Sequence, residues 1–157
     1  MISAFARLVQ DTNLNQLATS YHLIKAVMTK RRRKSLESQV QSGCVKWFRL
    51  QYPKFKMLLF AIPNGAVLKG DYVQRAKQMN RLKSEGLVPG SADLFLSIPS
   101  GDYSGLYIEM KTPKGRQSEN QKKFEESVLS VGYGYALPRS LDEFMKIVKS
   151  YLDNGEY

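Results

Sequence analysis

Apolar residues recur along this chain with two periods, and each period predicts a different kind of element. Steps of three and four residues are typical of helices that pack along one side, whereas continuous or alternating apolar runs are typical of strands. The helical steps cover about residues 11–29, 35–52, 71–85, 118–131 and 141–152, and the strand runs cover about residues 57–62, 93–96, 106–111 and 133–137. In this order, the elements predict an α/β fold with a mixed four-stranded sheet flanked by helices on both faces.

The connections between the strands predict how the strands pair. The link over residues 98–105 is rich in Pro, Ser, Gly and Asp, so the strands on either side of it are expected to be antiparallel neighbours. A helix separates the last two strands, and this order predicts a right-handed parallel crossover. The first strand, 57–62, is a continuous apolar run, which is typical of a buried strand.

Each predicted helix of the main body carries an apolar stripe that we expect to face the core. The stripes comprise Leu36, Val40, Cys44, Trp47 and Phe48; Tyr72, Ala76, Met79 and Leu82; Phe124, Val128 and Val131; and Phe144, Ile147, Val148 and Tyr151. Such stripes stabilise helices mainly through tertiary packing.

Residues 1–34 are expected to form a basic helical extension ahead of a domain that spans residues 35–157. Within the extension, residues 11–29 carry an apolar stripe close to a heptad seam. This stripe packs either on its own domain or on a second subunit. The five basic residues 30–34 form a joint, which is either a solvated hinge or a contact to phosphates.

The charge of the chain indicates a polyanionic partner. The formal net charge is +10, and residues 1–34 carry more than half of it. This distribution favours nucleic acid, although a basic composition alone also serves solubility. Charged helix faces are usually only solvated, and an asparagine in a turn needs no function. With those alternatives open, the side chains expected to contact DNA are Arg31, Arg32, Arg33, Asn64, Arg75, Arg81, Lys114 and Arg116.

The chain has one cysteine, Cys44, and one histidine, His22, which excludes an internal disulfide and the usual zinc sites. We interpret Cys44 as a small core residue and His22 as a surface or interface residue. No apolar run approaches the length of a membrane helix, and the first residues do not resemble a signal peptide. The expected location is therefore the cytoplasm.

Residues 88–121 place charged side chains within apolar strands. Asp93 begins one strand, and Glu109 and Lys111 lie two residues apart on the next, so the last two share a face. Antiparallel pairing could bring Asp93 beside Glu109. Because a buried charge is costly unless it is paired or bound to a metal, this arrangement indicates a divalent metal site.

The residues around these acids could perform phosphodiester hydrolysis. Carboxylate oxygens suit Mg²⁺, the carbonyl of Met110 would lie near the same ion, and Glu37 could add a ligand from the second helix. Lys111 could orient the attacking water or offset charge on the phosphate. Arg116 and Gln121 could hold the scissile phosphate or the water.

Three of these residues also have purely structural interpretations. Lys111 could form only an ion pair with a neighbouring acid. Glu37 could only interact favourably with the helix dipole. Gln121 could only complete a capping box with Ser118. The spacing of the residues leaves both sets of interpretations open.

Taken together, these motifs resemble the VRR-Nuc family of the PD-(D/E)XK nuclease superfamily. The resemblance covers about residues 35–151. It rests on Glu37 in the first helix of that region, the NG turn after the first strand, VPGSADLFL from Val88 and GLYIEMKTPKGRQSENQ from Gly105. It implies a restriction-endonuclease-like αβββαβ core and DNA cleavage that depends on Mg²⁺ or Mn²⁺. One departure is Ala92, which stands where the superfamily has a proline; that proline shapes the entry to the strand and performs no chemistry.

Carried onto this sequence, the resemblance implies metal binding by Glu37, Asp93 and Glu109, catalytic support by Lys111 and an accessory active-site role for Gln121. Small, stand-alone members of the family resemble viral and bacterial junction-cleaving enzymes that act as homodimers. The resemblance therefore implies branched DNA as the substrate, a second copy of the chain as a partner, and the cytoplasm of a bacterium or a virus-infected host cell as the location. The alternatives are a flap-cutting nuclease, a sequence-specific nuclease of the restriction type and a nucleic-acid-binding module without catalysis.

Overall fold

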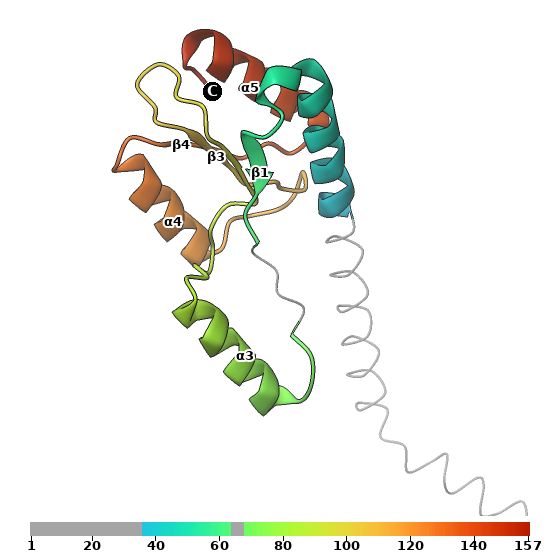
Figure 1. The fold of residues 1–157 in the computed structure, drawn as a ribbon, viewed down its shortest axis with the longest axis vertical. Coiled ribbons are helices and arrows are strands. Elements are labelled where there is room, and N and C mark those ends of the chain that lie inside the picture. Colours follow the sequence, from blue (N-terminus) through green and yellow to red (C-terminus); the bar gives the residue numbers. More distant parts are fainter. Residues whose placement is uncertain (1–35, 64–67) are drawn as a thin grey trace, which may run out of the picture. The chain divides into compact units, whose positions relative to one another are not determined.

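The structure is a computed structural model of the 157-residue chain, and it describes residues 36–63 and 68–157. The chain divides into two units, residues 1–38 and 39–157, and the second unit contains the strands found among the described residues (Figure 1). Several predictions concern residues outside the described ones, and these are the helical extension, His22, Arg31, Arg32, Arg33 and Asn64.

A four-stranded sheet lies at the centre of the second unit, with the strand order β1-β2-β3-β4. Its strands are β1 (Leu59–Ala61), β2 (Leu94–Leu96), β3 (Leu106–Ile108) and β4 (Gly134–Ala136). The β1–β2 and β2–β3 pairs are antiparallel, and the β3–β4 pair is parallel. The predicted mixed sheet is therefore confirmed, with its antiparallel and parallel neighbours.

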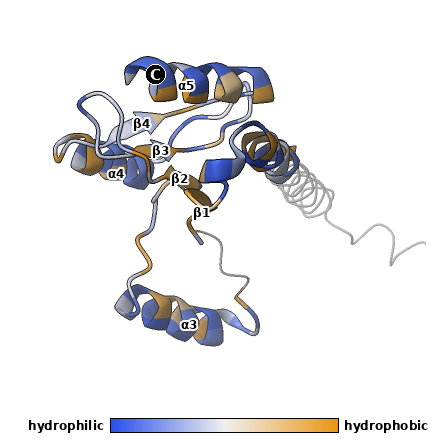
Figure 2. Cartoon of the chain, turned by 45° about the horizontal axis from the view of Figure 1, so that its top comes forward, coloured by the Kyte–Doolittle hydropathy of each residue, from blue (hydrophilic) through white to orange (hydrophobic). Residues whose placement is uncertain are grey.

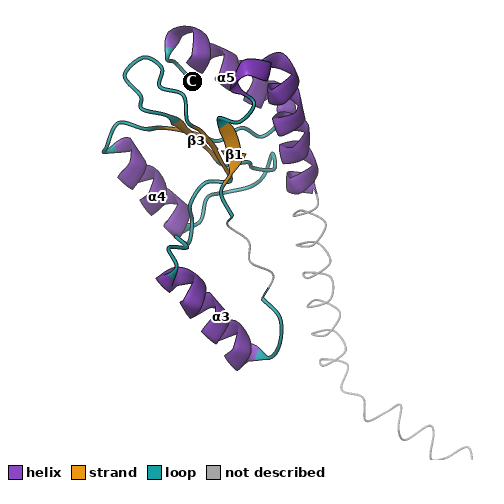
Figure 3. Cartoon of the chain, in the orientation of Figure 1, coloured by secondary structure: helices purple, strands orange, loops and turns teal. Residues whose placement is uncertain are grey.

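Four described helices follow the predicted stretches closely (Figure 3): the helix at residues 36–51, α3 (Tyr72–Ser84), α4 (Glu119–Leu129) and α5 (Leu141–Asn154). The short 3-10 helix η1 (Pro53–Phe55) lies outside the predicted stretches. Polar side chains cap three of them: Asp71 and Ser118 begin capping boxes at α3 and α4, and the Ser140 side chain accepts a hydrogen bond at the start of α5.

Side chains alternate between the two faces of the sheet and form two apolar clusters. The larger cluster joins one face to helix 36–51 and α5, and it contains Cys44, Phe48, Leu59, Leu94, Leu96, Leu106, Ile108, Met110, Ala136, Phe144, Val148 and Tyr151. The smaller cluster lies on the α4 side and contains Ala92, Val128 and Tyr135, with Tyr107 and Phe124 packed against it. Figures 1 and 3 show α4 and α5 on opposite sides of the sheet, as predicted.

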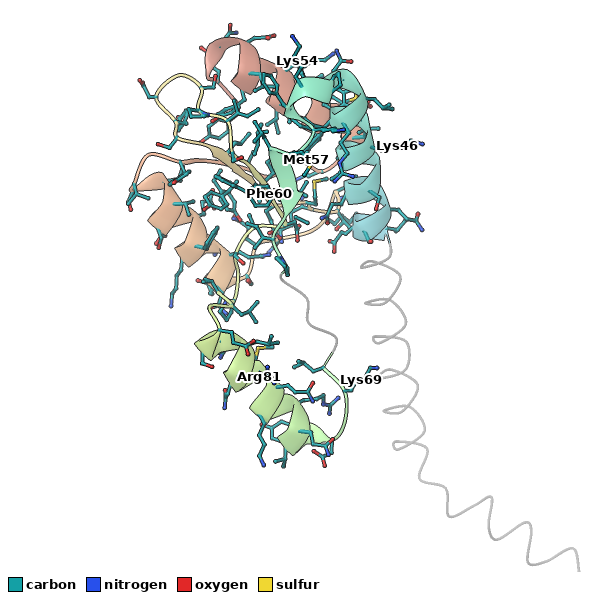
Figure 4. All side chains as sticks on the ribbon, in the orientation of Figure 1. Lys46, Lys54, Met57, Phe60, Lys69 and Arg81 are labelled. Carbon is teal, nitrogen blue, oxygen red and sulfur yellow. The ribbon has the colours of Figure 1, made fainter. Side chains whose placement is uncertain are left out.

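The prediction that residues 57–62 form a buried strand is wrong. Only Leu59 is buried, whereas Met57 is 77% exposed and Phe60 is 46% exposed; Figure 4 labels both. In the described sheet, β1 is an edge strand that pairs with β2 alone. A continuous apolar run predicts burial on both faces, and an edge strand does not meet that condition.

Several of the predicted inward-facing residues are exposed. No residue of α3 is buried, and Tyr72 is 80% exposed; Figure 2 shows α3 as largely hydrophilic. Val131 is exposed because α4 ends at Leu129, so Val131 lies in the turn before β4. Leu36, at the start of its helix, is half-exposed. Helical spacing identifies an apolar stripe, but it does not show whether another element covers that stripe.

Candidate active site

Asp93 and Glu109 lie opposite each other at the same end of β2 and β3. The strand register pairs Leu94 with Ile108, so the next antiparallel positions are Asp93 and Glu109. Oδ2 of Asp93 accepts a hydrogen bond of 2.9 Å from the N–H of Met110. Glu109 is only 3% exposed. The structure thus places the two acids together, as the sequence predicts.

A glycine turn before β2 determines where Asp93 lies. Gly90 has a φ of +91°, a conformation that favours glycine. A Cβ atom at this position would lie 2.5 Å from the main-chain carbonyl carbon of Asn120. The turn therefore packs directly on the first turn of α4. This contact connects the strand that begins near Asp93 to the helix that carries Gln121.

Main-chain pairing beyond the end of β3 positions Glu109 and Lys111. Their N–H groups donate to the carbonyls of Ala136 and Pro138 at 2.9 and 3.0 Å, so the extended conformation continues and both side chains share a face. Nζ of Lys111 donates to Oε1 of Glu109 at 2.9 Å, and both side chains are largely buried. The ion pair that spacing allows is therefore present.

Gln121 contacts this ion pair from α4. Its Oε1 accepts hydrogen bonds from the N–H of Ser118 and from Nζ of Lys111, each at 2.9 Å, and its Nε2 donates to Oε1 of Glu109. The same side chain therefore completes the capping box and contacts the charged pair. The capping interpretation of Gln121 is confirmed, and the bond to Ser118 helps to fix the amide beside Glu109, whereas a role for this amide at a phosphate or a water stays a prediction.

Tyr135 lies near the cluster formed by Asp93, Glu109, Lys111 and Gln121. It is not among the site residues that the sequence predicts. It is a buried residue of β4, and its register partner is Tyr107 on β3. Burial raises the pKa of the Tyr135 phenol far above its usual value, and the nearby carboxylates, chiefly Glu109, raise it further. The hydroxyl therefore stays protonated throughout the neutral pH range. Its sequence signal, an aromatic residue in a strand, is indistinguishable from that of an ordinary core residue.

Arg139 is a second residue that the sequence does not single out. The exposed side chains of Lys114 and Arg116 belong to the loop that follows Lys111. Arg139 stabilises this loop, because its Nη1 donates to three loop carbonyls at 2.9, 3.2 and 2.9 Å, those of Thr112, Pro113 and Gly115. Its sequence signal is a single basic residue before a helix cap, which predicts nothing about a distant loop.

The other predicted residues that the structure describes lie on α3 and on helix 36–51. Arg75 and Arg81 are exposed on α3, and Nε of Arg81 lies 2.7 Å from Oε1 of Glu85, so a neighbouring acid already offsets the charge of Arg81. Glu37 lies in the first turn of helix 36–51 and belongs to the unit of residues 1–38. The four-residue cluster is formed entirely by residues of the other unit.

The donor set of this cluster fits a hard divalent cation. Asp93 and Glu109 offer carboxylate oxygens from adjacent strands, and Met110 follows with a main-chain carbonyl. Within residues 36–63 and 68–157, no group of three His, Cys, Asp or Glu side chains could hold a metal. Mg²⁺ commonly takes one or two carboxylates and completes its shell with waters and substrate oxygens, so it suits this set better than zinc does.

No helix within the described ranges has the length and apolarity needed to cross a membrane.

Comparisons with known proteins agree with the geometry. Residues 36–140 match the family model of the VRR-NUC domain, and this range contains all four residues of the cluster. A solved structure of a VRR_NUC domain protein is similar to this chain, with a TM-score of 0.64 and 22% sequence identity, over 76% of this chain and 90% of that one; this likeness shows a shared fold. No curated protein matches the chain. The chain therefore belongs to the VRR-NUC domain family, whose members have a nuclease-like fold.

Proposed function

We propose that this protein is a metal-dependent DNA endonuclease that hydrolyses phosphodiester bonds. The observation that carries the proposal is the cluster in which Asp93 lies opposite Glu109, while Lys111 and Gln121 both donate to Oε1 of Glu109. Membership of the VRR-NUC family supports nuclease activity in general. The net charge of +10 supports a polyanionic substrate.

The proposed metal ligands are Asp93, Glu109 and the carbonyl of Met110, with Glu37 as a further ligand directly or through water. A bound Mg²⁺ or Mn²⁺ would offset charge on the phosphate and make a water more acidic. Lys111 is a rigidly held cation at the edge of this set, suited to stabilise negative charge on the phosphate or to orient the attacking water. Gln121 would hold the water or the phosphate through its amide.

The path of the DNA would begin at the loop after Lys111. Lys114 and Arg116 are exposed there, and Arg139 holds the loop in place, so both cations are available to phosphates near the cut. Such contacts position the backbone and carry no sequence information. Arg75 on α3 would contact phosphate further away, and Asn64, Arg31, Arg32, Arg33 and Arg81 complete the proposed contacts.

More specifically, we propose that the protein acts as a homodimer and cuts branched DNA. A two-fold dimer would place two active sites on two strands of a junction. Support comes from the exposed edge at β1, where Met57 and Phe60 offer apolar surface that a second copy could cover.

Cleavage of end-labelled DNA tests the proposal. Four-way junction, 5′-flap, single-stranded and duplex DNA would each be incubated with Mg²⁺, Mn²⁺ or EDTA. We expect metal-dependent cutting with a preference for the junction. Preference for the flap would reject the junction substrate, and tight binding without cutting in either metal would favour a binding module. A monomer mass at all concentrations in light scattering would reject the dimer.

A further inference from the structure

A pocket opens on the α4 side of the sheet, the face that also carries Glu109. Its volume is about 460 Å³, within the range of about 300–1,000 Å³ that is typical of small-ligand sites. Most of the lining is apolar. It comes from the residues after β1, the end of α3 with the turn that follows it, β3 and α4. The principal lining residues are Ile62, Leu82, Leu87, Val88, Tyr107 and Phe124.

The floor of the pocket is continuous with the candidate active site. Tyr107 precedes Glu109 by two residues on the same face of an extended chain, a step of about 6.6 Å. Phe124 follows Gln121 by three residues on α4, so their side chains lie on the same side of the helix. A group that occupies the pocket would therefore lie about one nucleotide from the carboxylates.

Local hydrogen bonds fix one side of the pocket, at the end of α3 and in the turn that follows it. Gly86, two residues beyond the end of α3, has a φ of +100°. The N–H groups of Gly86 and Leu87 donate to the carbonyls of Lys83 and Leu82 at 3.1 and 2.8 Å. These bonds are those of a Schellman motif, which places Leu82 and Leu87 together. The hydroxyl of Ser91 also donates to the carbonyl of Val88 at 2.9 Å. These bonds hold the residues at the end of α3 and in the following turn in place, which lowers the cost of ordering this side of the pocket.

The chemistry of the lining favours a flat aromatic group that belongs to an anionic chain. The rings of Tyr107 and Phe124 meet edge to face, with centroids 5.2 Å apart, and supply aromatic surface for stacking. The last turn of α3 carries Arg81 and Lys83 beside the lining residue Glu85. Glu85 pairs with Arg81 at 2.7 Å, so Lys83 is the cation of this turn whose charge that pair does not offset. A lipid tail would use the apolar walls but would make no use of this cation.

We propose that this pocket binds an unpaired nucleobase of the strand whose phosphate lies at the Asp93–Glu109 site. The inference rests on the proposed nuclease function and adds the feature that the enzyme recognises. Bases next to a branch point unstack at lower cost than bases within a duplex. The pocket thereby gives a physical reason for a preference for branched over continuous duplex DNA.

Removal of single bases tests the pocket without any need for cutting. The wild-type protein would be titrated, in Ca²⁺ to suppress cleavage, with four-way junctions that carry one abasic site at successive positions near the crossover. Since base–aromatic stacking contributes substantially to single-strand binding, the abasic site is expected to weaken binding roughly 5- to 100-fold at one position. Equal affinity for every abasic junction would overturn the proposal.

A pocket-filling variant identifies the place where the base binds. Val88 is 51% exposed at the rim, so Val88→Trp should fill the pocket without disturbing the core. We expect Val88→Trp to bind the intact junction as weakly as the wild type binds the junction whose abasic site lies at the sensitive position. The affinity of Val88→Trp should also no longer depend on the position of the abasic site. The matched control is Val131→Trp, at a position that is 66% exposed and outside the lining, which should behave as the wild type does.

The outcomes separate this inference from the proposed function. If Val88→Trp keeps the full abasic sensitivity, the base binds elsewhere and the pocket proposal is overturned. If the wild type shows the position effect but never cuts DNA in Mg²⁺, the pocket is supported and the nuclease proposal is rejected. If the wild type cuts DNA but binds every abasic junction with equal affinity, the nuclease proposal is supported and the pocket proposal is rejected. Phe124→Leu, which removes one ring and keeps an apolar side chain, repeats the test should Val88→Trp fold poorly.

Discussion

At the scale of single residues, the candidate site is built around the buried carboxylate of Glu109. One of its oxygens accepts from both Lys111 and Gln121, and its neighbour across the sheet is Asp93. Buried ion pairs often contribute little net stability, because desolvation offsets the attraction between the charges. Stability alone therefore gives a weak reason for this cluster, and a role in binding a cation and phosphate gives a stronger one.

Substitution of Lys111 by methionine separates chemistry from DNA binding. Lys111→Met should lower the single-turnover cleavage rate at least about 100-fold, because it removes the cation beside the reacting phosphate. It should also lower the free energy of unfolding by about 3 kcal/mol, because Glu109 stays buried without its ion-pair partner. DNA affinity should change only a few-fold.

The matched control for that variant is Lys114→Met on the exposed loop. It should weaken binding and reduce the salt dependence of binding, while cleavage at saturating protein stays near the wild-type rate. If Lys111→Met cuts DNA as fast as Lys114→Met does, the proposed role of Lys111 is wrong.

Binding of metal to the two acids should stabilise the folded protein without any DNA. A ligand that binds only the native state adds about 2.7 kcal/mol at a concentration 100 times its Kd, so Mg²⁺ should raise the thermal midpoint relative to EDTA. Asp93→Asn should abolish most of that rise. An equal rise in the wild type and in Asp93→Asn, measured by calorimetry, would place the ion elsewhere.

At the scale of elements, the start of α4 connects folding to the site. Ser118 accepts from the N–H of Gln121 and donates its own N–H to the Gln121 side chain. Ser118→Ala should cost about 1 kcal/mol of stability, as N-cap losses typically do, and should also slow cleavage, because the Gln121 side chain is held less firmly. The measurements are urea denaturation and single-turnover cleavage.

Ser140→Ala is the control for that prediction, since Ser140 caps α5 through the N–H of Glu143. It should lose similar stability while cleavage stays unchanged. Equal effects of the two variants on cleavage would mean that general destabilisation, and not the position of Gln121, explains the result.

The turn before β2 allows a similar comparison between two glycines. Gly90 and Gly86 both have positive φ, but a Cβ would meet the main chain of Asn120 at Gly90 and nothing within 4 Å at Gly86. Gly86→Ala should therefore cost about 1 kcal/mol from backbone strain alone. Gly90→Ala should cost more than about 2 kcal/mol and impair cleavage, because α4 must shift away from β2. Equal losses on denaturation would show that this contact is not tight.

The order of the elements could be predicted from the sequence because periodicity is a local property. The meeting of Asp93 with Glu109 follows from the same local information, since a short link implies antiparallel pairing and pairing sets the register. Whether another element covers an apolar surface is not a local property, and for that reason the exposure of Phe60 and Tyr72 could not be predicted. Tyr135 and Arg139 carry ordinary residue signals, so only the tertiary structure shows that they lie beside the site or stabilise its loop.

At the scale of the whole described unit, the two faces of the sheet have different roles. The face that packs with helix 36–51 and α5 holds the larger apolar cluster and supplies most of the buried apolar surface. The α4 face holds the smaller cluster, the four residues of the candidate site and the aromatic pocket. A rigid core on one face thus supports the chemistry on the other, so variants on the α4 face can change cleavage at limited cost in stability.

The measurement that tests the central claim most directly compares the wild type with Asp93→Asn in single-turnover cleavage of a four-way junction in Mg²⁺. DNA affinity would be measured beside it in Ca²⁺. Asn is nearly isosteric with Asp and keeps an oxygen that can accept from the N–H of Met110, so the fold and the binding surface should persist. Cleavage should fall at least about 1,000-fold, as expected when a metal ligand is lost, while affinity stays within a few-fold. Cleavage by Asp93→Asn at the wild-type rate would contradict it, because the Asp93–Glu109 pair would then not be the active site.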